Sequence, residues 1–141
     1  MAPRVPRALP PVLLLVLSIT ACGYRDPARP AEARATAQTF VSSCGRDRPL
    51  TAIEVLTEPL RDTFTRSGSP PQACARFLGL DPGRQSDQAL LAKLRAVTVA
   101  SVAVRGAAAI VRLAVPAAPA SVISLQFSEG EWRIDSGPTA T

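Results

Sequence analysis

The sequence contains no histidine, one lysine and one tyrosine among its 141 residues. Without histidine there is no Ser–His–Asp triad, and a cysteine nucleophile lacks the base that it normally needs. Lys93 is the only lysine for a serine–lysine pair, and no motif joins it to Ser42 or Ser43. A zinc site requires four ligands, which three cysteines cannot supply. We therefore expect no metal and no cofactor.

Acidic residues are in the minority, with 11 Asp and Glu against 16 Lys and Arg, for a formal net charge of +5. The positive charge is spread over single arginines and forms no run, whereas a nucleic-acid surface requires a basic stripe with interleaved aromatics. We therefore expect no nucleic-acid partner. Gly83 and Gly106 stand alone, so a phosphate-cradling loop is not expected either.

One apolar block, Leu9 to Ala21, follows a start that carries Arg4 and Arg7 and no acidic residue. The block is shorter than the roughly 20 residues that a membrane-spanning helix needs, which predicts a cleaved export signal over residues 1–21. The four residues up to Cys22, Ile-Thr-Ala-Cys, resemble the bacterial lipobox. The alternative is an ordinary secretory signal cut at the same place, which leaves Cys22 as a free or paired thiol.

The lipobox resemblance implies that Cys22 becomes the first mature residue and receives a diacylglycerol with palmitate-like chains. Two acyl chains anchor a protein stably, whereas one is marginal. Residues 22–30 contain two prolines and no periodicity, which is typical of a short tether. We expect a protein anchored through Cys22 to the cell membrane on its extracytoplasmic face.

Export also places the other two cysteines, Cys44 and Cys74, in an environment that permits oxidation. The sequence therefore predicts a disulfide between them. Such a bond closes a loop of about 30 residues and contributes roughly 3.5 kcal/mol in the chain-entropy model.

The domain over residues 31–137 divides into a helical half and a half with alternating apolar residues, followed by a tail over 138–141. Apolar spacing and helix-ending prolines and glycines predict four helices. They are Ala31 to Cys44, Leu50 to Leu60, Gln72 to Leu78, and Ser86 to Arg95 with Ser86 as its cap.

After Arg95 the period changes to two, and short turns separate four candidate strands. They are Val97 to Val104, Ala107 to Val115, Ser121 to Ser128 and Glu131 to Asp135. Connections this short favour an antiparallel meander. We therefore expect an α+β fold, with amino-terminal helices packed on a four-stranded antiparallel sheet.

The ending Ser124 to Ser136, in which a glycine turn precedes Trp-Arg-Ile-Asp, looks like the last hairpin of nuclear-transport-factor-like domains. Val102 to Val111 is similar to the hairpin before it. With the anchor and the cysteine pair, the chain resembles small actinobacterial lipoproteins that carry this domain, also called cystatin-like or SnoaL-like. The resemblance implies a strongly bent sheet in a cone, with a pocket between sheet and helices.

Enzymes with this cone place an aspartate with a tyrosine or histidine in the cavity for proton transfer. Asp135 is the only carboxylate in a position to be that base, and the single tyrosine, Tyr24, lies in the tether. Alternation with Ile134 puts Asp135 on the wetter face, where we expect it to pair with Arg133 or cap a turn. No catalytic residue is assigned, and an enzyme is not expected.

Two further features favour structural roles. Glu129 and Glu131 flank a turn glycine, which predicts solvated turn residues rather than a calcium site. Trp132 is expected to anchor the core rather than stack on a ligand. The sequence thus predicts a non-enzymatic binding or interaction module in the cell envelope, for an envelope protein or a small apolar ligand. The alternatives are a SnoaL-like enzyme that uses Asp135 and a purely structural envelope protein.

Overall fold

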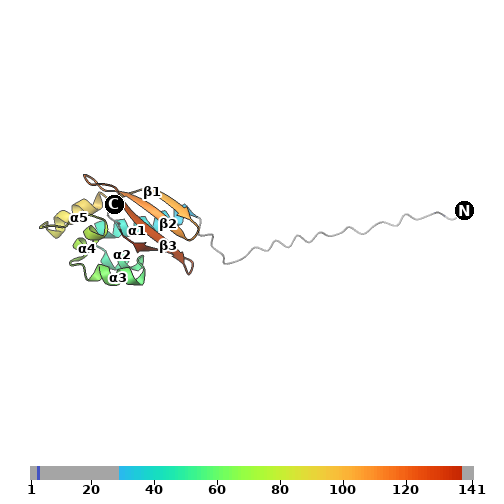
Figure 1. Ribbon diagram of the computed structural model, residues 1–141, viewed down its shortest axis with the longest axis horizontal. Coiled ribbons are helices and arrows are strands. Elements are labelled where there is room, and N and C mark those ends of the chain that lie inside the picture. The colour runs from blue at the N-terminus through green and yellow to red at the C-terminus, as the bar shows by residue number, and fades with distance from the viewer. Residues whose placement is uncertain (1–2, 4–28, 138–141) are drawn as a thin grey trace.

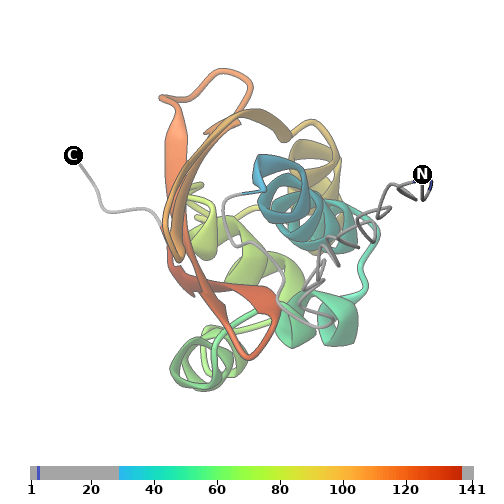
Figure 2. The same ribbon diagram turned by 90° about the vertical axis from the view of Figure 1, so that its right-hand side faces the viewer.

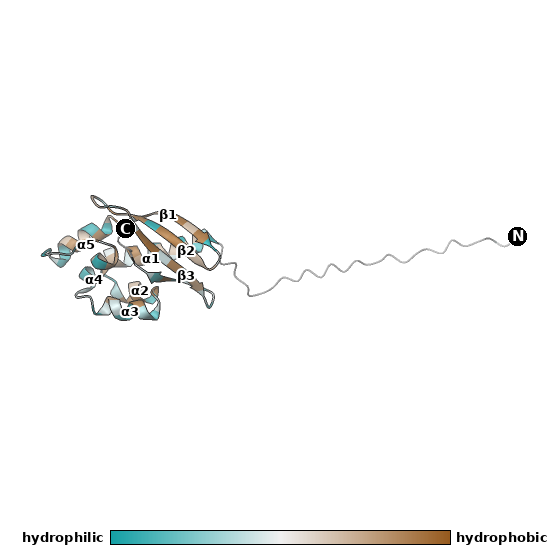
Figure 3. Ribbon diagram, viewed as in Figure 1, coloured by the Kyte–Doolittle hydropathy of each residue, from teal (hydrophilic) through white to brown (hydrophobic). Residues whose placement is uncertain are grey.

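A computed structural model describes residue 3 and residues 29–137, in which five helices precede a four-stranded antiparallel sheet. The predicted signal peptide, Cys22 and the tail over 138–141 lie outside the described residues. The helices gather against one face of the sheet (Figures 1 and 2). Hydrophobic residues dominate the strands, whereas the helices mix polar and apolar residues (Figure 3). The α+β arrangement predicted from the sequence is confirmed.

The first helix, α1 (Pro30–Gly45), begins with a proline in its first turn, where the missing N–H is tolerated. Its apolar residues recur every three or four positions and are buried, which confirms the predicted amphipathic helix. They are Ala33, Ala37, Phe40, Val41 and Cys44. The helix begins at Pro30, one residue before the predicted start of the domain, and residues 22–28 of the predicted tether lie outside the described residues.

The single helix predicted over Leu50 to Leu60 is wrong, because the structure has two helices, α2 (Pro49–Glu54) and α3 (Glu58–Thr65). Between them the chain runs beside the sheet. The Thr57 N–H donates to the Ile134 carbonyl at 2.9 Å, and the Ile134 N–H donates to the Val55 carbonyl at 2.8 Å. These sheet-like hydrogen bonds replace one helical turn, and the prolines at 49 and 59 then start new helices rather than interrupting one.

The last two helices, α4 (Pro70–Phe77) and α5 (Asp87–Arg95), both have serine caps. The Ser69 hydroxyl accepts the Gln72 N–H at 3.4 Å, and the Gln72 side chain accepts the Ser69 N–H at 3.3 Å. The Ser86 hydroxyl accepts the Ala89 N–H at 3.2 Å, as the sequence predicted. These caps fix where each helix begins, because they satisfy N–H groups that have no partner inside the helix.

The sheet consists of β1 (Thr98–Arg105), β2 (Ala108–Ala114), β3 (Ser121–Ser128) and β4 (Glu131–Ser136), in the order β1-β2-β3-β4. In β2, exposed and buried residues alternate strictly, so one face packs on the core and the other faces solvent. Ile110 on the outer face is 56% exposed. The predicted antiparallel meander is therefore confirmed, with one open face.

The two edges of the sheet differ. On the β4 edge, Leu56 forms a parallel bridge with Ile134. On the opposite edge, β1 pairs with β2 alone, and its register shifts between Val99 and Ser101. Such a bulge bends an edge strand and increases its twist. β1 also contacts α1 and directly follows α5 in the chain.

Candidate functional site

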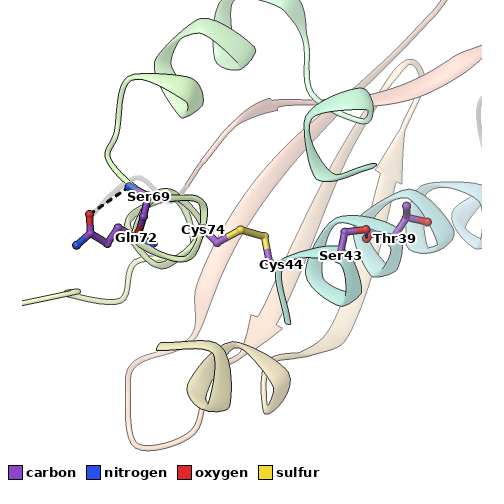
Figure 4. Close-up of a disulfide and its surroundings, with 6 residues drawn as sticks. All are labelled: Thr39, Ser43, Cys44, Ser69, Gln72 and Cys74. Atoms are coloured by element: carbon purple, nitrogen blue, oxygen red, sulfur yellow. Dashed lines mark hydrogen bonds between the residues drawn. A yellow bond between two sulfur atoms is a disulfide. The ribbon is translucent and has the colours of Figure 1, made fainter. Parts of the chain in front are cut away.

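The disulfide is the first predicted site that the structure contains. Cys44, at the end of α1, is bonded to Cys74 in α4, with the Cα atoms 5.8 Å apart (Figure 4). Both cysteines are 2% exposed and belong to the hydrophobic core. The capped start of α4 aims Cys74 at α1, so helix capping and covalent linkage support the same packing.

The space between helices and sheet, where the family resemblance places a pocket, is filled by side chains. The ten largest buried side chains are each less than 2% exposed and pack closely against one another. They are Phe40, Leu56, Leu78, Leu90, Leu94, Val111, Leu113, Ile123, Leu125 and Ile134. Trp132 joins this core at 5% exposure and packs edge-on against Phe127, with ring centroids 5.3 Å apart. Its predicted role as a core residue is confirmed.

Hollows are found at the flanks of α1 instead. The larger one, which we call the α1–α5–β1 groove, has a volume of about 380 Å³. Its apolar lining residues are Val41, Leu94, Val97 and Val99, and its uncharged polar ones are Gln38, Ser42 and Thr98. Gly45, Arg46 and Arg95 complete the lining. None of the described residues that line the groove is acidic.

Gly45 allows the two helix ends to meet at the groove. A Cβ at this position would lie 3.1 Å from the Arg95 Cα, so only glycine permits this approach of α5 without a shift. The Arg95 Nε donates to the Gly45 carbonyl at 3.0 Å and caps the end of α1. A third arginine, Arg34, donates to the Val99 carbonyl at 3.5 Å. The groove is therefore formed by backbone packing as well as by side chains.

A second hollow, of about 370 Å³, lies at the other end of α1 and has the opposite charge. Glu32, Glu54 and Glu131 line it, together with Arg133. Arg133 is already engaged, since it pairs with Glu131 at 3.0 Å and donates to the Glu54 carbonyl at 3.0 Å. The Trp132 Nε1 beside this hollow has no hydrogen-bond partner among the described residues.

The candidate base Asp135 lies on the exposed face of β4, as predicted. The expected pairing with Arg133 is wrong, because Arg133 binds Glu131, its neighbour on the same side of the strand. The Asp135 carboxylate forms no hydrogen bond or ion pair with any side chain or backbone group of residues 29–137. Nor do Ser43 and Lys93 form a pair, since the Ser43 hydroxyl donates to the Thr39 carbonyl at 2.6 Å and Lys93 is exposed.

Within residues 29–137, no helix is both long and apolar enough to cross a bilayer. In the same part of the chain, no three histidine, cysteine, aspartate or glutamate side chains cluster as a metal site. No protein-family model, curated protein or solved structure matches the chain. Function therefore has to be inferred from the disulfide, the groove and the open sheet face.

Proposed function

We propose that this protein is an extracytoplasmic lipoprotein, anchored through acylated Cys22 to the cell membrane. Its domain acts as a non-enzymatic binding or interaction module in the cell envelope. The predicted tether over residues 22–30 would connect the anchor to the folded part, whose first helix begins at Pro30. The helices on one face of a four-stranded sheet are consistent with a cystatin-like cone, the fold that we propose for this module.

One observation carries the proposal, the disulfide between Cys44 and Cys74. Disulfides form and persist in oxidising compartments and are rare where glutathione and thioredoxin keep thiols reduced. A buried disulfide therefore supports export, which is the first step of the lipoprotein pathway. The amino-terminal sequence also supports export, and it involves residues other than the two cysteines of the disulfide.

A binding role is supported by the surfaces that the fold leaves open. The outer face of the sheet exposes Ile110, and the α1–α5–β1 groove combines apolar walls with two arginines. Ligand sites in proteins are commonly concave and mostly apolar, with a few polar groups that orient the ligand. The filled interior leaves these outer surfaces as the places where a partner or ligand would be bound.

The test is membrane fractionation of the full chain and of a Cys22→Ala variant, with mass spectrometry of the mature amino terminus. We expect the unchanged chain to sediment with membranes and to carry an acyl adduct on Cys22, and the variant to lose both. Cys44→Ala is the control, because it removes a cysteine of the disulfide and leaves Cys22 unchanged. The anchor would be refuted if the unchanged protein and Cys22→Ala associated equally with membranes and the unchanged protein carried no acyl adduct.

The binding role is tested by crosslinking in intact envelopes followed by affinity purification. An interaction module is expected to retain the same partner in the Cys22→Ala and unchanged chains, at a lower yield in the variant. If no specific protein and no specific small molecule were recovered, the proposal would be contradicted. Only the alternative of a purely structural envelope protein would then remain.

A further inference from the structure

The α1–α5–β1 groove carries a net positive charge. Arg46 and Arg95 each contribute one full charge, and no described lining residue is acidic. Asp47 follows Arg46 in the chain but does not line the groove. The carbonyl ends of α1 and α5 contribute roughly half a negative charge each. The two guanidinium groups outweigh them, which leaves the groove at roughly +1 and attractive to an anion.

Both guanidinium groups have free donors. Arg95 uses Nε alone to bind the Gly45 carbonyl, which leaves its two terminal amino groups without a partner among the described residues. Arg46 is exposed, and its side chain forms no hydrogen bond or ion pair within residues 29–137. Guanidinium groups bind oxyanions through paired, charge-assisted hydrogen bonds. A carboxylate is therefore a matched headgroup for this end of the groove.

Apart from the arginines and Gly45, the groove is lined by four apolar residues and by the uncharged polar residues Gln38, Ser42 and Thr98. Val41 from α1, Leu94 from α5, and Val97 and Val99 at the start of β1 form its walls. The volume of about 380 Å³ lies within the range of small-molecule sites and is too small for a folded partner. The second hollow has almost the same volume but is lined by three glutamates, so charge rather than size distinguishes the two sites.

We propose that the α1–α5–β1 groove binds a small amphiphilic carboxylate, with the carboxylate on Arg46 and Arg95 and the apolar body against the valines. This inference depends on the binding role proposed above and narrows it to one ligand class. Its test is separate from the test of the anchor, because the variants that change the groove leave Cys22 unchanged.

Photolabelling of the full-length, membrane-associated protein with para-benzoylbenzoate tests the proposal. Reduction and trypsin digestion yield the peptides 35–46 and 96–105, which together contain most of the groove lining. We expect saturable labelling of these two peptides, competition by decanoate, and little labelling by the neutral analogue para-benzoylbenzamide. Repeating the experiment with Cys22→Ala shows whether binding is independent of the anchor.

Two pairs of variants localise the site. Arg46→Gln is expected to weaken labelling about tenfold, whereas Arg48→Gln, a nearby exposed arginine outside the groove, should leave it unchanged. Ser42→Trp places a large side chain in the groove and should abolish labelling. The matched control is Thr39→Trp, which makes the same change at an exposed position of α1 that does not line the groove.

Three outcomes would overturn the proposal. The first is labelling that does not saturate or that is equal for the neutral amide, since either result means partition into lipid. The second is unchanged labelling in both Arg46→Gln and Ser42→Trp. The third is crosslinking of the two peptides to a second copy of the chain, which would make the groove an interface. If labelling fails while Cys22 remains acylated, the ligand assignment is wrong and the anchor stands.

Discussion

Reducing the bond between Cys44 and Cys74 should lower the free energy of unfolding by roughly 3.5 kcal/mol. The two cysteines are 30 residues apart in the sequence, and the chain-entropy model gives this value for a loop of that length. Domains of this size have a total stability of about 5–15 kcal/mol. The bond therefore contributes a large share, because without it α4 is held to α1 by noncovalent packing alone.

Urea unfolding with and without a reductant measures this difference directly. Trp132 is the single tryptophan and is 5% exposed, so its fluorescence reports unfolding without a label. Reduction of the unchanged protein is a better perturbation than Cys44→Ala with Cys74→Ala, since truncation also removes buried sulfur atoms and adds a packing loss. The Cys22→Ala variant serves as background, so that only the two core cysteines respond to the reductant.

If thiol counting shows full reduction and the extrapolated unfolding free energy is unchanged within about 0.5 kcal/mol, the bond does not stabilise the fold. A second check uses the single variants Cys44→Ala and Cys74→Ala. Both should be less stable than the unchanged chain, and reductant should have no further effect on them.

Four substitutions test the packing, each by urea unfolding. Gly45→Ala should lower stability by about 1 kcal/mol, because the new Cβ would lie 3.1 Å from the Arg95 Cα, and the gain in helix propensity offsets only part of this overlap. Ser69→Ala removes the α4 cap and should lower stability by about 1 kcal/mol. Ile134→Ala empties a fully buried position and should lower it by about 3 kcal/mol. Asp135→Asn should change stability by less than about 0.5 kcal/mol, since the carboxylate is exposed, and should leave groove labelling unchanged. If the unchanged protein converted a small molecule to product and Asp135→Asn did not, the result would favour the enzyme alternative.

Local sequence signals predicted most of the fold. The spacing of Ala33, Ala37 and Phe40 identified α1, because a helix that covers a sheet needs one apolar stripe. Alternation identified β2 and β3, because buried residues alternate with exposed ones in β2 and with half-buried ones in the first half of β3. The cysteine pair could be predicted because only two cysteines remained once Cys22 was assigned to the anchor.

The division between α2 and α3 could not be predicted in the same way. Ile53, Leu56 and Leu60 have helical spacing, so the local pattern favours one continuous helix. Leu56 instead forms a bridge with Ile134, a residue far along the chain. Hydrogen bonds to the sheet thus outweighed the local preference for one continuous helix, and Pro59 lies in the first turn of a new helix.

The sequence also did not predict the groove, because the groove too depends on a contact between distant parts of the chain. Arg46 and Arg95 each look like ordinary solvated arginines at the ends of separate helices. They come together because Gly45 lets α5 approach α1, a contact between residues 50 apart in the sequence. The only local signal was a glycine followed by an arginine at the end of α1, which by itself is typical of an ordinary helix terminus.

Three consecutive residues at the end of α1 connect stability to the proposed ligand site. Cys44 bonds α4, Gly45 packs on α5, and Arg46 lines the groove, with its backbone N–H donating to the Ser42 carbonyl at 3.0 Å. The disulfide therefore holds the last turn of the helix that positions Arg46. If the disulfide strengthens binding at this turn, reciprocity requires the bound anion to stabilise the oxidised arrangement by the same factor. Reduction should then weaken ligand binding as well as folding, so a carboxylate ligand would be retained best where the disulfide is stable.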